Sequence, residues 1–174
     1  MRHALLSVVV GLSTLAGGCK SIDMVELQPT IEEAPALASA VRVSDPAQSN
    51  QLVSGFYEIQ AGAWRWTAPQ FQVLLAAPRA AATRGAQLVF EFSLPDPSIA
   101  SLKSVTVGAT INRLQLPPET YTTSGLHEYR RDIPASALGA PEVSVAFSVD
   151  KFLTPPNDGR NLALVATAIA LEPK

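Results

Sequence analysis

The sequence predicts an all-β fold, an antiparallel β-sandwich of jelly-roll type, over residues 51–174. Three observations support this prediction. Short runs of alternating apolar and polar residues recur after residue 50. Clusters of Pro, Gly, Asn and Asp separate these runs at intervals of roughly ten residues, which is typical of sandwiches. No segment beyond residue 50 carries a long helical stripe. An immunoglobulin-like sandwich is the alternative, although its usual cysteine pair is missing.

Individual strands follow from the alternation. Glu142–Val149 places four apolar side chains on one side and small residues on the other. Segments 104–111 and 87–94 repeat this pattern, with Thr106, Gly108 and Thr110 as the outward residues of the first. Further strands are expected at 55–59, 64–67, 71–75, 127–133 and 161–171. The links at 76–86, 94–103 and 113–125 are expected to cross between two sheets, which favours the jelly roll.

The N-terminal sequence predicts a signal peptide over residues 1–18. Arg2 precedes an apolar run from Ala4 to Leu15, which is shorter than the roughly 20 residues that a bilayer span requires. The run ends in Leu15-Ala16-Gly17-Gly18-Cys19, which resembles the lipobox of bacterial lipoproteins, with Ala16 where Leu is more usual. An ordinary secretory signal is the alternative.

The lipoprotein resemblance implies a membrane anchor and a location. Cys19 would carry lipid after cleavage and would hold the protein in the bacterial cell envelope. Lys20, directly after it, resembles an outer-membrane address rather than an inner-membrane one. Residues 19–50 contain several prolines and no aromatic residue, so we expect them to form a flexible tether.

Composition narrows the possible partners. Removing residues 1–18 takes away one basic residue and leaves a net charge near −3, which disfavours nucleic-acid binding. The remaining chain has one histidine, His127, and one cysteine, Cys19. Zinc, copper and iron–sulfur sites normally need several such ligands, so we expect no metal and no cofactor.

The triplet Trp64-Arg65-Trp66 is the most conspicuous motif. On a strand both indoles lie on one side and the guanidinium on the other. Exposed indoles would form an apolar platform that stacks on sugar rings, whereas buried indoles would belong to the core. The core interpretation is favoured. Arg65 is expected to pair with a carboxylate, and Glu58, Asp150 and Asp158 are its candidates.

Catalysis is not expected. His127 is the only histidine after the signal segment, and no Gly-x-Ser-x-Gly pattern marks a nucleophile. Two carboxylates can suffice for glycoside hydrolysis, but the sequence does not pair the available ones, which are Glu58, Glu91, Glu128 and Asp132. The turn Asp158-Gly159-Arg160 can fix a loop or bind sugar hydroxyls, and the first use is favoured.

The order of motifs resembles a β-sandwich accessory module found with bacterial glycosyltransferases and cell-surface carbohydrate proteins. The shared elements are Gly55-Phe56-Tyr57, Trp64-Arg65-Trp66, His127-Glu128-Tyr129 and Asp158-x-Arg160 before the last strand. The resemblance implies a jelly-roll-like fold in a polysaccharide setting. It makes seven residues candidates for ligand binding: Tyr57, Trp64, Arg65, Trp66, Tyr129, Asp158 and Arg160. The alternative function is a structural or assembly lipoprotein that docks onto another envelope protein.

Overall fold

The computed structural model describes residues 36–174, which form one compact antiparallel β unit. Its strands are β1 (Ala40–Arg42), β2 (Leu52–Gln60), β3 (Trp64–Ala76), β4 (Ala86–Leu94), β5 (Val105–Ile111), β6 (Leu114–Tyr121), β7 (Gly125–Ile133), β8 (Glu142–Val149) and β9 (Val165–Pro173). Four short helical elements lie between them: η1 (Pro46–Gln51), α1 (Ala81–Arg84), α2 (Asp96–Leu102) and η2 (Ala135–Ala137). Within residues 36–174, no helix is long and apolar enough to cross a membrane.

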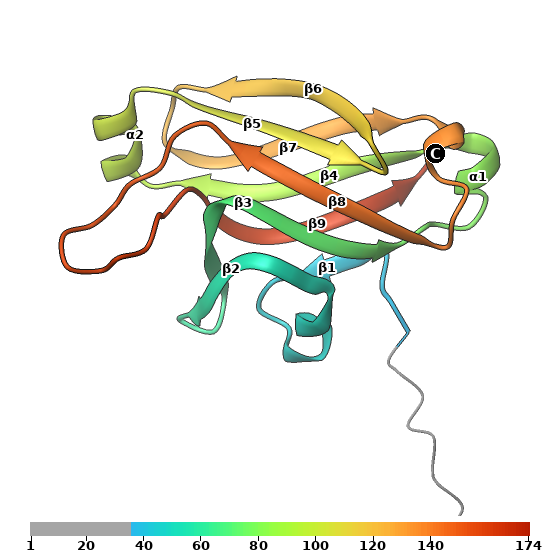
Figure 1. Ribbon diagram of the computed structural model, residues 1–174, viewed down its shortest axis with the longest axis horizontal. Coiled ribbons are helices and arrows are strands. Elements are labelled where there is room, and N and C mark those ends of the chain that lie inside the picture. The colour runs from blue at the N-terminus through green and yellow to red at the C-terminus, as the bar shows by residue number, and fades with distance from the viewer. Residues whose placement is uncertain (1–35) are drawn as a thin grey trace, which may run out of the picture. The chain divides into compact units, whose positions relative to one another are not determined.

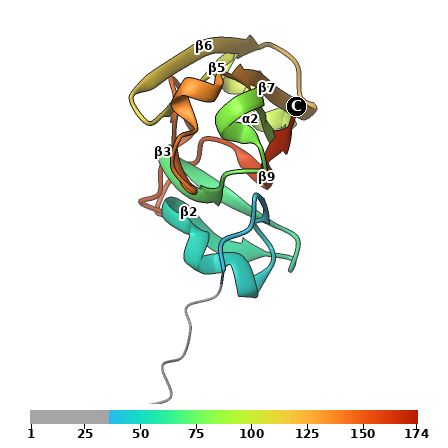
Figure 2. The same ribbon diagram turned by 90° about the vertical axis from the view of Figure 1, so that its right-hand side faces the viewer.

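The strands form two layers that share β3. Their hydrogen-bonded order is β6-β5-β8-β3-β9-β4-β7, with β1 added to β9 and β2 added to β3. In Figure 1, β5 and β8 pass in front of β7, β4 and β9; in Figure 2, β5 and β6 lie above β3, and β2 lies below it. The prediction of an antiparallel, jelly-roll-like sandwich is therefore confirmed.

Aromatic side chains from four strands fill the space between the layers. Phe71 of β3 stacks on Phe147 of β8 with ring centroids 4.8 Å apart, and Phe90 of β4 lies within 5.4 Å of both rings. Phe92 and Tyr129 extend this cluster along β4 and β7. All five rings are almost completely buried, as alternation in their strands predicts.

β3 is one strand where two were expected. Its residues Arg65 and Trp66 pair with β9, whereas Gln70–Ala76 pair with β8. Ala68 and Pro69 lie where the strand leaves one neighbour and reaches the other. Proline has no N–H to donate, so the sheet accommodates it at this change of partner without a lost ladder bond.

β6 occupies part of the segment 113–125, which was expected to be a link. Asn112 and Arg113 both have positive φ, 46° and 75°, and form a two-residue turn between β5 and β6. Among the strands that the structure describes, β6 pairs only with β5, so it is an edge strand. An edge strand tolerates Pro117 and Pro118, because one side of its backbone has no partner strand. The links 76–86 and 94–103 contain α1 and α2.

The folded unit begins earlier than the expected boundary at residue 51. Ala40–Arg42 pair with β9, and Val41 and Val43 are buried. Gln51 is 2% exposed; its side chain accepts from the Ala38 N–H at 2.9 Å and donates to the carbonyls of Ala38 and Leu74. A three-residue strand is too short to show alternation, which is why it was assigned to the tether. The predicted signal peptide, Cys19 and the first part of the tether lie outside the described residues.

The final strand also starts later than expected, at Val165 rather than Asn161. Before it, Leu162 forms an isolated bridge with Leu153, which closes a loop between β8 and β9. The β2 strand is longer than the predicted 55–59 and contains three register shifts against β3. These irregularities bend the β2–β3 hairpin away from the sandwich, as Figure 1 shows.

Candidate functional site

The two indoles of the Trp-Arg-Trp triplet contact each other. Trp64 and Trp66 pack edge to face with ring centroids 6.2 Å apart, and both are half-buried. They are therefore neither core residues nor a flat exposed platform. The favoured core interpretation is wrong, because the core phenylalanines pack against one another without the indoles.

Arg65 has a structural role. Its Nε donates to the carbonyl of Val43 at 2.7 Å, and its Nη1 donates to the carbonyl of Tyr57 at 3.1 Å. The prediction that it pairs with Glu58, Asp150 or Asp158 is wrong, because backbone carbonyls at the β1 and β2 segments satisfy the guanidinium. Arg65 thus fastens the early strands to each other.

Tyr57, Asp158 and Arg160 do come together, around the loop between β8 and β9. The Tyr57 hydroxyl contacts both the N–H and the carbonyl of Asn161 at 3.2 Å. The Arg160 guanidinium lies 5.5 Å from the centre of the Tyr57 ring and binds both carboxylate oxygens of Asp158, at 2.5 and 2.7 Å. The Arg160 hydrogen bonds lower the pKa of Asp158. Since these groups satisfy one another, they fix the loop.

Tyr129 belongs to the core. Its ring is fully buried, its hydroxyl donates to the Pro117 carbonyl at 2.8 Å, and the Arg131 guanidinium covers it at 4.3 Å. Burial raises its pKa. A surface ligand therefore does not reach Tyr129. The alternation in the sequence placed Tyr129 on the same side of the strand as His127, but it did not show that this side faces inward.

Two of the candidate carboxylates are neighbours on the outer surface of β4 and β7. Glu91 and Glu128 are directly opposite in the antiparallel ladder. Arg130 binds both oxygens of Glu128, at 2.5 and 3.0 Å, and also Glu172 at 2.9 Å. These bonds lower the pKa of Glu128, whereas a glycosidase acid requires a raised value. Glu128 is therefore occupied in an ion-pair network.

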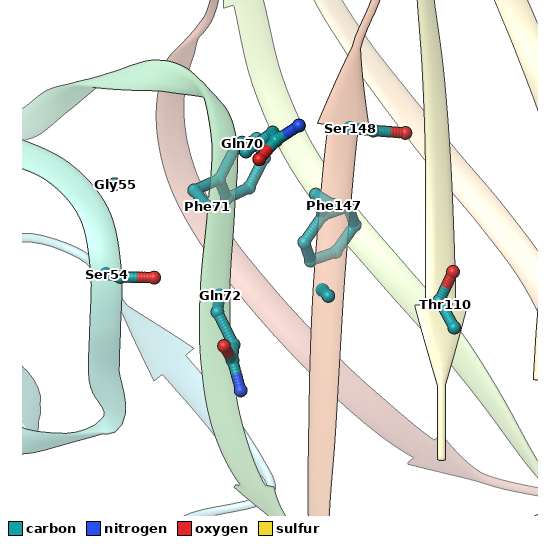
Figure 3. Close-up of a pocket in the computed structure, with 9 residues that line it drawn as sticks. Ser54, Gly55, Gln70, Phe71, Gln72, Thr110, Phe147 and Ser148 are labelled. Atoms are coloured by element: carbon teal, nitrogen blue, oxygen red, sulfur yellow. The ribbon is translucent and has the colours of Figure 1, made fainter. Parts of the chain in front are cut away.

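A shallow hollow lies on the other layer, across β2, β3, β8 and β5. We call it the amide hollow; its volume is about 410 Å³. Figure 3 shows the side chains of Gln70 and Gln72 on β3 beside those of Ser54, Ser148 and Thr110 on the neighbouring strands. The complete lining is Ser54, Gly55, Gln70, Phe71, Gln72, Thr110, Ala146, Phe147 and Ser148. No charged residue belongs to it.

The polar groups of the amide hollow are largely free to bind a ligand. Gln72 Nε2 donates to the Ser144 hydroxyl at 2.7 Å, which leaves its carbonyl oxygen available. The side chains of Ser54, Gln70, Thr110 and Ser148 make no hydrogen bond with any other group of residues 36–174. Amides and hydroxyls both donate and accept, so the hollow can serve a ligand with many hydroxyl groups.

The wall of the amide hollow depends on a close backbone approach at Gly55. This residue has φ of +75°, and a Cβ here would lie 2.2 Å from the Gln70 carbonyl oxygen and 2.7 Å from the Phe71 Cα. Glycine therefore allows β2 to rest directly on β3 at the point where Gln70 turns outward.

The sequence carries a signal for this surface in the outward residues of two strands. The outward residues of the alternating strands are Ser144, Ala146 and Ser148 on β8 and Thr106, Gly108 and Thr110 on β5. They are small and uncharged, unlike the outward Glu, Arg and Asp residues of β7. Pairing of β5 with β8 brings the two sets side by side, and this pairing was not predicted.

No group of three or more His, Cys, Asp or Glu side chains within the described part of the chain is arranged to hold a metal ion.

No protein-family model matches the sequence, and no curated protein is similar to it. Solved structures with a similar strand arrangement include a family 36 carbohydrate-binding module in complex with calcium and xylotriose, with TM-score 0.43 and 14% identity over 76% of this chain and 98% of the module. Another is a family 35 carbohydrate-binding module from an environmental isolate, with TM-score 0.42 and 16% identity over 82% of this chain and 90% of the module. A third is a carbohydrate-binding module that recognises mannan, with TM-score 0.41 and 14% identity over 80% of this chain and 98% of the module. At these levels of similarity, no residue or ligand is transferred to this chain.

Proposed function

We propose that this protein is a lipid-anchored envelope protein whose non-catalytic β-sandwich binds carbohydrate. The observation that carries the proposal is the amide hollow, an open depression of about 410 Å³ lined by amide and hydroxyl side chains without a charged residue. Neutral sugars present closely spaced hydroxyl groups that both donate and accept hydrogen bonds. Gln70, Gln72 and Ser148 offer the complementary groups.

The difference between the two outer faces supports this choice of ligand. On β7, on β9 and directly after β9, ion pairs form between the side chains of Glu128, Arg130, Glu172, Asp132 and Lys174. Their hydrogen-bonding capacity is therefore used within the protein. On β3, β8 and β5, most polar side chains of the amide hollow remain unpaired and exposed to solvent. The second face is the better surface for a polyhydroxylated ligand.

Binding to a glycan array tests this proposal. We expect the full chain in detergent to bind one or more glycans and the double variant Gln70→Ala/Gln72→Ala to lose at least tenfold in affinity, since each lost hydrogen bond contributes about 1 kcal/mol. Gln60→Ala, on the β2–β3 hairpin outside the hollow, is the matched control and should bind normally. A Trp64→Ala/Trp66→Ala variant tests stacking by the half-buried indoles. Unchanged binding by the glutamine variant would reject the amide hollow.

The anchor is a separate part of the proposal. The lipobox-like Leu15-Ala16-Gly17-Gly18-Cys19 supports lipid attachment to Cys19, and Lys20 supports outer-membrane sorting. We expect cells to incorporate labelled palmitate into the wild-type protein but not into Cys19→Ser. Wild-type protein that remains unlabelled and free of membranes would contradict the anchor while leaving carbohydrate binding untouched.

A second candidate function is docking onto another envelope protein. Leu126 at the start of β7 is 83% exposed, beside a depression of about 310 Å³ that Phe92 and His127 help to line. An exposed apolar side chain next to a depression suits a protein contact. If no glycan binds, and Leu126→Asp abolishes co-purification of one defined envelope protein, docking becomes the better account.

A further inference from the structure

A second hollow adjoins the amide hollow on the same face. We call it the threonine hollow; it lies over β5, β6 and β8 and has a volume of about 200 Å³. Its lining is Thr106, Gly108, Ala109, Thr110, Gln115, Leu116, Pro118, Ser148, Val149 and Asp150. Thr110 and Ser148 belong to both hollows. The two depressions therefore adjoin each other at the β5–β8 pair.

Together the two hollows run across the strands rather than along them. In the order of the sheet they pass over β2, β3, β8, β5 and β6. Neighbouring strands lie about 4.8 Å apart, so four such steps give a groove roughly 19 Å long. This length suits a short stretch of a sugar chain better than a single sugar ring.

Gly108 lines the threonine hollow and pairs with Ser148, which lines both hollows. It faces outward on β5, and a Cβ there would lie 3.1 Å from the Ser148 hydroxyl oxygen and 3.9 Å from the Pro118 Cβ. Its φ lies outside the left-handed range, so the backbone does not require glycine. The extra residue of the adjacent bulge belongs to β6, not to β5. Glycine inside a strand often marks a place where another group approaches closely. Here the missing side chain leaves room for a ligand between the two hollows.

The charge of the lining restricts the ligand. Across both hollows the single ionisable side chain is Asp150, directly after β8, where its carboxylate accepts from the Thr106 N–H at 2.6 Å. No lysine or arginine lines either hollow. An anionic sugar would lose hydration here without gaining a cationic partner, and Asp150 would repel it.

We propose that the two hollows form one groove, which binds an uncharged glycan along its chain, across the strands and over Gly108. This inference rests on the proposed function and adds the ligand's class, its direction and a second subsite. The amide hollow holds one part of the chain through Gln70 and Gln72. The threonine hollow holds the next part through Thr106 and Gln115.

Calorimetric titration of the full chain in detergent tests the groove. The probes are β-1,4-linked glucose, mannose and xylose oligosaccharides from disaccharide to hexasaccharide, with oligogalacturonate as the anionic counterpart. For at least one neutral series, we expect affinity to rise about tenfold or more with length, because further hydrogen bonds form in the second hollow. Oligogalacturonate should bind at least tenfold more weakly than the neutral hexasaccharide.

Variants separate the groove from the general proposal. Gly108→Val should remove the gain in affinity with chain length; Gly139→Val is the control, because a Cβ at Gly139 has open space around it. Gln115→Ala, at an exposed position of the threonine hollow, should also weaken hexasaccharide binding and serves if Gly108→Val fails to fold.

Each outcome decides a defined point. If short and long oligosaccharides bind equally, or if both variants bind the hexasaccharide normally, the groove is wrong while carbohydrate binding stands. If oligogalacturonate binds as tightly as the neutral hexasaccharide, the proposal that the ligand is uncharged is wrong. If neither these oligosaccharides nor any array glycan binds, the proposed function itself fails, and the groove fails with it.

Discussion

Gly55 and Gly62 both have positive φ, but only at Gly55 would an added Cβ meet other groups. Alanine at Gly55 would place its Cβ 2.2 Å from the Gln70 oxygen, whereas the same change at Gly62 meets nothing within 4 Å. We predict that Gly55→Ala destabilises the protein by more than about 2 kcal/mol and deforms the amide hollow. Gly62→Ala should cost only about 1 kcal/mol, the strain of the left-handed backbone. Urea unfolding measures both; equal losses would refute the close approach.

Tyr129 and Tyr57 show what motif analysis could and could not assign. Both were candidate ligand residues, and neither presents a free hydroxyl: Tyr129 binds Pro117 inside the core, and Tyr57 binds Asn161 at the surface. Alternation showed which neighbours share a side of a strand, but the inward side depends on how distant strands pair. The Asp158–Arg160 contact was the exception, because it is local and its loop-fixing use was the favoured interpretation.

The buried hydroxyl of Tyr129 leads to a stability prediction. Tyr129→Phe keeps the ring but removes the 2.8 Å bond to the Pro117 carbonyl, which still accepts from Arg131 Nε. We expect a loss of about 1 kcal/mol in unfolding free energy, because a net buried hydrogen bond contributes that amount. Glycan affinity should not change. A loss of binding without a loss of stability would restore Tyr129 to the ligand site.

Among the strands, β8, β5 and β4 were predicted almost to the residue because one of their sides is buried and the other is solvated. β6 was missed because an edge strand with two prolines shows neither alternation nor the usual composition. β1 was missed because its position depends on the edge of β9, a partner more than 120 residues away along the chain. The groove was missed for a related reason, since strand pairing assembles it from separate, unremarkable residues.

The segment before β2 makes a prediction about the domain boundary. A fragment beginning at residue 51 lacks Val41 and Val43, which are 1% and 0% exposed. Loss of these two side chains should cost about 3–5 kcal/mol relative to a fragment beginning at residue 36. Gln51→Ala in the longer fragment should loosen the same segment, because its side chain makes three hydrogen bonds. Equal unfolding midpoints for the two fragments would show that β1 adds nothing.

For the whole molecule, the ion pairs of the charged face and of the β8–β9 loop predict a dependence of stability on pH. Hydrogen bonds lower the pKa of Glu128 through Arg130, of Asp132 through Lys174 and of Asp158 through Arg160. A carboxyl whose pKa is lower in the folded state stabilises that state above its unfolded pKa of about 4. This contribution is lost as pH falls through the folded values.

Urea unfolding between neutral and strongly acidic pH measures this effect. For the wild type, the urea concentration at the unfolding midpoint should decrease once the pH is lowered below about 4. The triple variant Glu128→Gln/Asp132→Asn/Asp158→Asn should be less stable at neutral pH and should show a smaller fall in acid. A variant with an unchanged pH profile would show that these exposed pairs do not contribute. Glycan binding should be insensitive to the three substitutions, because the charged residues lie outside both hollows.

The two outer faces of the molecule differ in their side chains. On one face charged side chains pair with one another, and the other face presents unpaired amides and hydroxyls. The most direct test is an NMR titration of isotope-labelled protein with soluble polysaccharide from the parent cell, which reports where a ligand lies. We predict shifts in the side-chain amides of Gln70, Gln72 and Gln115 and in the backbone of β3, β8 and β5. Shifts confined to β4 and β7 or to the Asp158–Arg160 loop, or no shifts at saturation, would contradict the account.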